Sequence, residues 1–373
     1  MKNNSNKQIF NRKKMLIISF SIILSVIFLF LTLFFVLKID VKEIFSSIAQ
    51  TFKEDFQFAA FLSFILFFYL VIKFLLFWIP YAIRLKKENI KLGFIDSFVF
   101  VLTSFFLVAV TPANFVSDPY ATYFLKRKGV VQNRAVAITL LNAFLWHIVQ
   151  MIITIPSFFI ICTQYQEIIN NTEIHVIFWF TIVGILIDFF ILFWLLVFCY
   201  SLKTHYLLSL FLNKIKKIFK IAYHTKEEIK IKYIDEKKFK KIMNELLFDY
   251  KKTLLTILIY TINELYLYFL VFISLKFINI KIEFDVFKIF NITNVVFTAN
   301  KFILTPGGEM SIEYFMQGFL KDKIISGIDT TNDILIDNSI LIWRTFSMYI
   351  PAILGLIMMP IIIPKTFKKI KKT

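Results

Sequence analysis

The sequence predicts an all-α integral membrane protein with about six full transmembrane helices and two oppositely oriented re-entrant helical hairpins, arranged like an inverted repeat. Apolar residues make up 58% of the 373 residues, and the mean hydropathy is +0.72. Several runs without charge reach the roughly 20 residues needed to cross the hydrocarbon core of a bilayer. Two further apolar runs stop early at Thr-Pro breaks. These observations exclude a soluble globular domain.

The first predicted span is Met15–Leu37, which contains no charged residue. Its apolar core is longer than that of a cleaved signal peptide, and Lys38-Ile39-Asp40 follows it without a small-x-small cleavage site. We therefore expect a retained anchor. In residues 38–55 the apolar side chains recur at helical spacing, which predicts an interfacial helix.

Five more full spans are predicted from uncharged or nearly uncharged runs. They are Phe56–Ile79, Val136–Cys162, His175–Leu202, Thr253–Leu275 and Ser339–Ile363. The first of these contains Lys73, whose ammonium group is expected to snorkel toward the inner interface. The two cysteines, Cys162 and Cys199, are read as small apolar fillers, and no disulfide is predicted.

Two apolar runs are too short to be equivalent to these spans. Residues 94–110 end at Thr111-Pro112-Ala113-Asn114, and residues 287–304 end at Thr305-Pro306-Gly307-Gly308. Each break is followed by a short segment that is expected to be helical. Irregular backbone cannot face lipid, because its N–H and C=O groups would be unpaired. Both breaks are therefore expected to be buried in protein or to line a watery cavity.

The distribution of charge predicts the topology. With a cytoplasmic N-terminus and hairpins that return to their side of entry, 32 of the 43 Lys and Arg residues face the cytoplasm and 8 face outward. This bias follows the positive-inside rule. We therefore expect a multi-pass protein of the plasma membrane with both termini in the cytoplasm. The net charge of +18 is therefore a topology signal, and no nucleic acid is expected as a partner. Residues 1–373 form one membrane domain, with a basic cytoplasmic insert at 203–252.

The two hairpins enter from opposite faces. Two sets of three elements follow the same order in the chain. One set is the second span, the first hairpin and the third span, and the other is the fifth span, the second hairpin and the sixth span. The two sets run through the membrane in opposite directions. Inverted repeats of this kind are typical of transporters, whose sites lie at broken helices near the middle of the bilayer.

Ionisable residues in apolar segments mark functional sites more often than not, and helix N-termini attract anions. Each of these features also has a purely structural interpretation. Glu313 could be a solvated side chain and Glu309 a helix cap, and each break could be a plain turn at the membrane surface. Arg344 needs a partner, either Glu309 or Glu313, or else a lipid phosphate that its planar fork could hold. The substrate-path candidates are Thr111, Pro112, Asn114, Asp118, Thr305, Pro306, Gly307, Gly308, Glu309, Glu313 and Arg344.

Three residues inside full spans are secondary candidates: His147, Asp188 and Glu264. The two acids either belong to a proton or substrate route or are neutral acids hydrogen-bonded to a neighbouring helix, and the sequence weighs these readings equally. His147 is expected to be a hydrogen-bonded packing residue, because no second His or Cys lies at ligand spacing. No metal, cofactor or catalytic residue is predicted.

The stretch Thr305-Pro306-Gly307-Gly308-Glu309…Glu313, followed by Ile342-Trp343-Arg344…Pro351…Gly355, resembles the membrane region of lysylphosphatidylglycerol synthases (multiple peptide resistance factors) and related flippase-like proteins. The earlier stretch from Thr111-Pro112 through Asp118-Pro119 to Gly129 is similar to that family's first motif. The resemblance covers roughly residues 10–365. Two departures are Ala113-Asn114, where glycines are usual, and Asn142 with His147, where the family often has an acid–arginine pair and a later acid.

The resemblance implies movement of an aminoacylated, glycosylated or other lipid between leaflets, with membrane lipids, particularly those with anionic headgroups, as partners. It also implies that synthase chemistry belongs to a separate C-terminal domain. Because this chain ends at Thr373 after a short basic tail, no lysyl transfer is expected. Two alternatives stay open: a membrane-embedded transferase acting on a lipid-linked substrate, and a non-catalytic scaffold that docks a cytoplasmic partner through residues 203–252.

Overall fold

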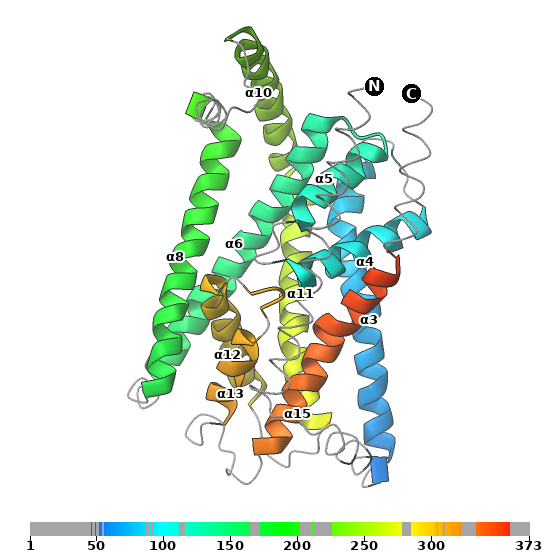
Figure 1. Cartoon of the computed structure of the whole chain (residues 1–373), viewed down its shortest axis with the longest axis vertical. Coiled ribbons are helices and arrows are strands. Elements are labelled where there is room, and N and C mark those ends of the chain that lie inside the picture. The colour runs from blue at the N-terminus through cyan, green and yellow to red at the C-terminus, as the bar shows by residue number, and fades with distance from the viewer. Residues whose placement is uncertain are drawn as a thin grey trace, which may run out of the picture.

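The computed structural model describes a bundle of helices (Figure 1). No described residue lies in a β-strand. The residues described are 46, 49, 52–53, 56–86, 90, 93–111, 116–164, 172–201, 207, 210–211, 226–277, 285–303, 305–308, 310–321 and 333–358. The first predicted span and most of the predicted interfacial helix lie outside them.

Five long apolar helices confirm the other predicted spans. Each of them is long and apolar enough to cross a membrane. The fifth consists of α15, a π-helical turn η5 (Thr345–Tyr349) and a final helical stretch, and its apolar part runs over Ile336–Met358. The helices are α3 (Phe56–Leu85), α6 (Gln132–Gln164), α8 (Thr172–Tyr200), α11 (Tyr250–Phe277) and α15 (Asp333–Arg344).

The outer faces of these helices carry large exposed apolar side chains. On α3 they include Phe56, Phe61, Phe64 and Phe67, each more than half exposed. Apolar surface of this extent is unfavourable in water and favourable against lipid tails. The chain is therefore a multi-pass membrane protein.

Helices α3 and α11 are antiparallel neighbours. The rings of Tyr69 and Tyr266 stack near their middle with centroids 5.0 Å apart. Near the end of α3, Arg84 donates through Nη2 to Thr253 Oγ1 at the start of α11, at 3.3 Å. The end of α3 and the end of α11 therefore lie at opposite ends of the bundle.

The first hairpin follows the end of α3. Its arms are α4 (Phe94–Val110) and α5 (Ser117–Arg127), which pack against each other. Asp96, in the first turn of α4, forms a 2.5 Å ion pair with Lys128, which directly follows α5. The chain therefore returns to the end of the bundle from which it started.

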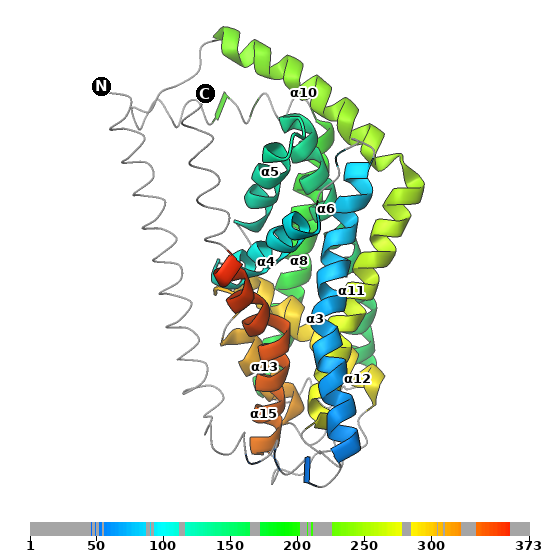
Figure 2. The same ribbon diagram turned by 90° about the vertical axis from the view of Figure 1, so that its right-hand side faces the viewer.

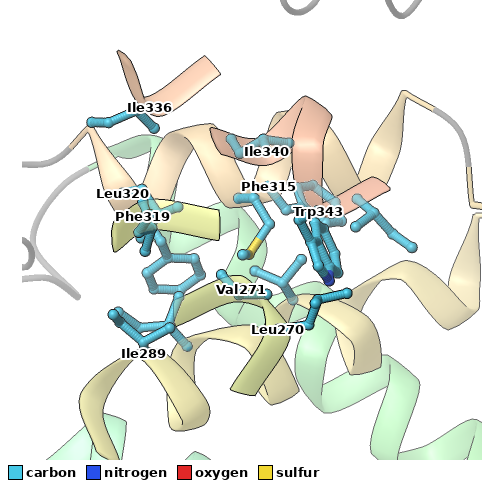
Figure 3. Packing of buried hydrophobic residues seen from close by; sticks show 14 of the residues in the cluster. Leu270, Val271, Ile289, Phe315, Phe319, Leu320, Ile336, Ile340 and Trp343 are labelled. Carbon is cyan, nitrogen blue, oxygen red and sulfur yellow. The ribbon is translucent and has the colours of Figure 1, made fainter. Parts of the chain in front are cut away.

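The second hairpin follows the end of α11. Its arms are α12 (Val286–Ala299), extended by the short 3-10 segment η3 (Asn300–Phe302), and α13 (Ser311–Leu320). Ile289, near the start of α12, lies beside Phe319 and Leu320 at the end of α13 in one apolar cluster (Figure 3). This hairpin, too, returns to its starting end.

The two halves of the bundle repeat one order of elements: long helix, short helix, break, short helix, long helix. Figure 2 shows α4 and α5 in the upper half of the molecule and α12 and α13 in the lower half. The first hairpin packs on η5, and α12 packs on α6, so each hairpin contacts the last long helix of the other half. The two hairpins therefore start from opposite ends of the bundle.

The basic insert contains α10 (Lys226–Leu247). The second half of α10 packs on α6 through Phe239, Met243 and Leu246, spaced along one face. The Arg84 guanidinium donates through Nη1 to the Leu246 carbonyl at 2.6 Å. Because Arg84 satisfies a carbonyl that the helix end leaves open, it fixes α10 to α3.

Candidate functional site

The two hairpin breaks lie side by side at the centre of the bundle. Gly307, in the second break, has φ +59°, and a Cβ added to it would lie 3.0 Å from the Ala109 carbonyl oxygen, just before the first break. The same Cβ would overlap the Met348 side chain in η5. Glycine is therefore required here both by the backbone conformation and by the closeness of a second backbone.

Hydrogen bonds hold the second break in shape. The Gly308 N–H donates to the Thr305 carbonyl at 3.2 Å, which closes a turn. The Ser311 hydroxyl contacts the Thr305 hydroxyl at 3.4 Å and donates to Asn300 Oδ1. Met310 has φ 68°, an uncommon conformation for a residue with a side chain. Pro306 lies in the same turn and is buried.

The first break is described only at its start. Thr111 is buried, and its hydroxyl donates to the Leu107 carbonyl at 2.5 Å. Pro112 and Asn114 lie outside the described residues, and so does Glu309 in the second break.

Arg344 forms an ion pair with Glu313, one of the two partners expected from the sequence. Both side chains are almost completely buried, with exposed fractions of 4% and 0%. The Arg344 Nε lies close to the Glu313 carboxylate, but its N–H group does not point at an oxygen in hydrogen-bond geometry. Arg344 also donates through Nη2 to the Gly307 carbonyl at 2.9 Å. The guanidinium thus ties the second break to the last span.

Glu313 lies in the first turn of α13, where the helix dipole favours a negative charge. Asp118 holds the corresponding place in the first turn of α5 and is exposed. Neither short helix has a side-chain hydrogen bond at its N-cap, which is Val116 for α5 and Met310 for α13. Glu313 therefore holds a place in the second hairpin similar to that of Asp118 in the first.

The prediction that Lys73 snorkels to the interface is wrong. Its ammonium group donates to the Ser347 carbonyl of η5 and lies 5.2 Å from the centroid of the Phe105 ring and 5.5 Å from that of Tyr69. A π-helical turn displaces carbonyls from the regular α-helical ladder, and aromatic faces attract a cation. These partners hold the ammonium group inside the protein.

A second group of charges joins α6, α8 and η3. Asp188 is fully buried, and its Oδ1 lies 3.2 Å from His147 Nδ1 while its Oδ2 pairs with Lys301. One turn before Asp188, a Cβ on Gly184 would overlap the Thr298 carbonyl, so α12 and α8 are in close contact there. Lys301 was not singled out from the sequence, although a lysine just before a break in an apolar run was a usable signal.

Glu264 is buried in α11, and Trp146 Nε1 donates to its Oε1 at 2.9 Å. This contact is the hydrogen bond to a neighbouring helix that one of the two sequence readings expected. Nearby, Asn294 of α12 accepts from Thr154 at 3.1 Å and from Tyr268 at 3.3 Å. Polar contacts therefore run through the middle of α6, α11 and α12.

One family model and two uncharacterised relatives match this chain. A family model described as "Lysylphosphatidylglycerol synthase TM region" matches residues 16–355. The "Uncharacterized protein MG306 homolog" of Mycoplasma pneumoniae is 31% identical over 261 residues, which cover 67% of this chain and 64% of that protein. The "Uncharacterized protein MG306" of Mycoplasma genitalium is 28% identical over 278 residues, 72% of this chain and 70% of that protein. No solved structure matches.

Proposed function

Because the chain belongs to the family of the lysylphosphatidylglycerol synthase TM region, we propose that this multi-pass membrane protein moves a lipid between the two leaflets of the plasma membrane. The observation that carries the proposal is the contact between the two hairpin breaks, which come from opposite ends of the bundle and meet beside the buried Arg344–Glu313 pair. A headgroup crossing the bilayer needs a polar environment at mid-depth, and broken helices supply one in transporters.

The lengths of the hairpin arms support a re-entrant position in the membrane. Helix α4 has 17 residues and α12 has 14. At 1.5 Å per residue they extend about 25 Å and about 21 Å, less than the ~30 Å of the hydrocarbon core. Both hairpins return to their starting ends, so each would dip into the membrane from one side.

In this proposal the headgroup path runs between the two breaks. Thr111 and Thr305 would offer hydroxyl groups, and the first turns of α5 and α13 would offer N–H groups that their N-cap residues, Val116 and Met310, do not cap. The Glu313–Arg344 pair would exchange its internal contact for contacts with a charged headgroup. Desolvation makes a buried pair of charges costly to keep, so a functional reason for its presence is expected.

The proposal is tested with purified protein in liposomes that contain leaflet-labelled lipids of several headgroups. Exchange should be faster than in empty liposomes, and Glu313→Gln or Arg344→Ala should slow it by about tenfold, a loss of about 1.4 kcal/mol of transition-state stabilisation. Lys128→Ala is the matched control, because it removes an ion pair at the base of a hairpin and away from the breaks. Exchange no faster than in empty liposomes, for every headgroup, would contradict the proposal.

A second candidate function is a scaffold for a cytoplasmic partner. The observation that favours it is that α10 is held firmly by α6 and Arg84 while Lys237, Lys238 and Lys241 on its surface stay exposed. Reversing these three charges would abolish partner binding in the scaffold model. Lipid exchange would be unchanged by the reversal if transport is the function and does not depend on a partner bound at this surface.

A further inference from the structure

We infer that Lys73 is the phosphate-binding residue of the site where the two hairpin breaks meet, and that its ligand is the phosphodiester group of a lipid. The inference deepens the proposed function and rests on it for the source of the phosphate. It assigns a ligand-binding role to a residue that was not among the candidates named from the sequence.

Lys73 lies beside the meeting point of the breaks. Its ammonium group donates to the Ser347 carbonyl, and the next residue, Met348, is the side chain that a Cβ on Gly307 would overlap. Phe105, on the first hairpin, forms another wall around the ammonium group. A single lysine from α3 therefore contacts both the first hairpin and the last span.

The charge of Lys73 is not neutralised by a neighbour within the described part of the chain. No described carboxylate lies within ion-pair distance of it, and its hydrogen-bond acceptor is an uncharged carbonyl. The other two cations of the centre differ in this respect, since Lys301 is paired with Asp188 and Arg344 with Glu313. The charged groups that act on Lys73 from a distance are Glu264 and Arg344.

A buried ammonium group without a counter-charge is costly, by several kcal/mol after relaxation. An anion that enters the site gains the full attraction of that charge, with no carboxylate of the described residues to displace. Lysine has three N–H donors, and the Ser347 carbonyl uses one of them. Lysine binds phosphate as a compact point charge, which suits a ligand that must also leave.

The test measures lipid binding directly, without transport. Wild type, Lys73→Met, Lys73→Arg and the control Lys276→Met are purified in detergent, and their Tm is followed with phosphatidylglycerol, with diacylglycerol of the same acyl chains, and with soluble glycerol phosphate. Lys276 is a suitable control because it lies in the last turn of α11, at the far end of a span. Phosphatidylglycerol should raise the Tm of wild type and of Lys276→Met, whereas diacylglycerol should not.

Lys73→Met should weaken phosphatidylglycerol binding by about tenfold or more, while Lys73→Arg should retain most of it. Protection by phosphatidylglycerol alone supports a lipid phosphodiester as ligand. Equal protection by glycerol phosphate at the same concentration supports the phosphate site but overturns the lipid as its source.

Equal binding of phosphatidylglycerol by wild type and Lys73→Met would overturn the inference, and so would equal protection of wild type by diacylglycerol. The second comparison uses the unaltered protein, so it stands even if Lys73→Met does not fold. If phosphatidylglycerol binding depends on Lys73 but no lipid crosses in liposomes, the proposed function fails while the binding site remains.

Discussion

At the scale of single residues, the buried charges at the centre have unequal roles in stability. The Glu313 carboxylate and the Arg344 guanidinium are both removed from solvent, so each depends on the other. By contrast, Asp96 and Lys128 keep 43% and 28% of their side-chain surface exposed. Exposed pairs of this kind contribute little, whereas breaking one half of a buried pair leaves an uncompensated charge.

Replacing one member of the central pair should therefore cost more than replacing both. Arg344→Met or Glu313→Leu alone is expected to lower the free energy of unfolding by about 3 kcal/mol, and the double variant is expected to lower it by less than either single variant. Unfolding in mixed detergent micelles measures these values. Lys128→Ala should cost under about 1 kcal/mol. Additive losses in the double variant would mean that the two side chains are not coupled.

Gly355 allows the last span to touch the first hairpin. A Cβ at this position would overlap the Leu102 carbonyl of α4 and approach the Phe106 Cβ. Gly355→Ala is thus expected to lower the Tm by several degrees, because α4 and the last span must move apart. Gly93→Ala is the matched control, since a Cβ there would have no atom within 4 Å. An unchanged Tm in Gly355→Ala would show that this contact is not tight.

At the scale of elements, Arg84 decides how firmly the insert helix is held. It donates to the Leu246 carbonyl and to Thr253, so it joins the end of α3 to the end of α10 and the start of α11. Arg84→Met would leave that carbonyl without its charged donor, at a cost of about 1.5–3 kcal/mol. Hydrogen exchange should become faster in residues 237–247 and stay unchanged in α8. Unchanged exchange in residues 237–247 would contradict this role.

The sequence predicted the long helices well because their signal is local. A run of about 20 apolar residues is sufficient to identify a span, whatever packs against it. The breaks were also predictable, since proline and glycine interrupt helices in any context. Contacts between segments that are distant in the sequence could not be predicted. The sequence left Glu309, Glu313 or a lipid phosphate as the partner of Arg344, and only the packing of α13 on α15 shows that Glu313 contacts it.

Lys73 is the instructive error at this scale. A lysine within reach of an interface normally snorkels, and hydropathy alone gives no reason to expect otherwise. Its actual acceptor is a carbonyl of η5, a segment 274 residues further along the chain. Since a π-helical turn has no recognisable sequence signal here, the partner and therefore the inward direction of Lys73 could not be predicted.

At the scale of the whole molecule, the hairpins determine which loops share a side of the membrane. The re-entrant arrangement predicts that cysteines placed at Gly93 and Val131 react with a membrane-impermeant reagent from the cytoplasmic side. Cysteines at Asp285 and Lys321 should react only from the opposite side. The experiment uses a background in which Cys162 and Cys199 are replaced. Reaction of Gly93 and Val131 from opposite sides would mean that the first hairpin crosses the membrane.

The π-helical turn η5 also changes the direction in which the side chains after it point, within a single span. Arg344, before the turn, faces the second hairpin, and Gly355, after it, faces the first. Each residue in an α-helix advances the face by about 100°, and a π-helical turn holds one residue more than an α-helical turn. Deleting one residue from 345–349 would therefore rotate Gly355 away from α4 while leaving Arg344 in place. One extra residue thus lets a single continuous helix contact two hairpins that start from opposite ends of the bundle.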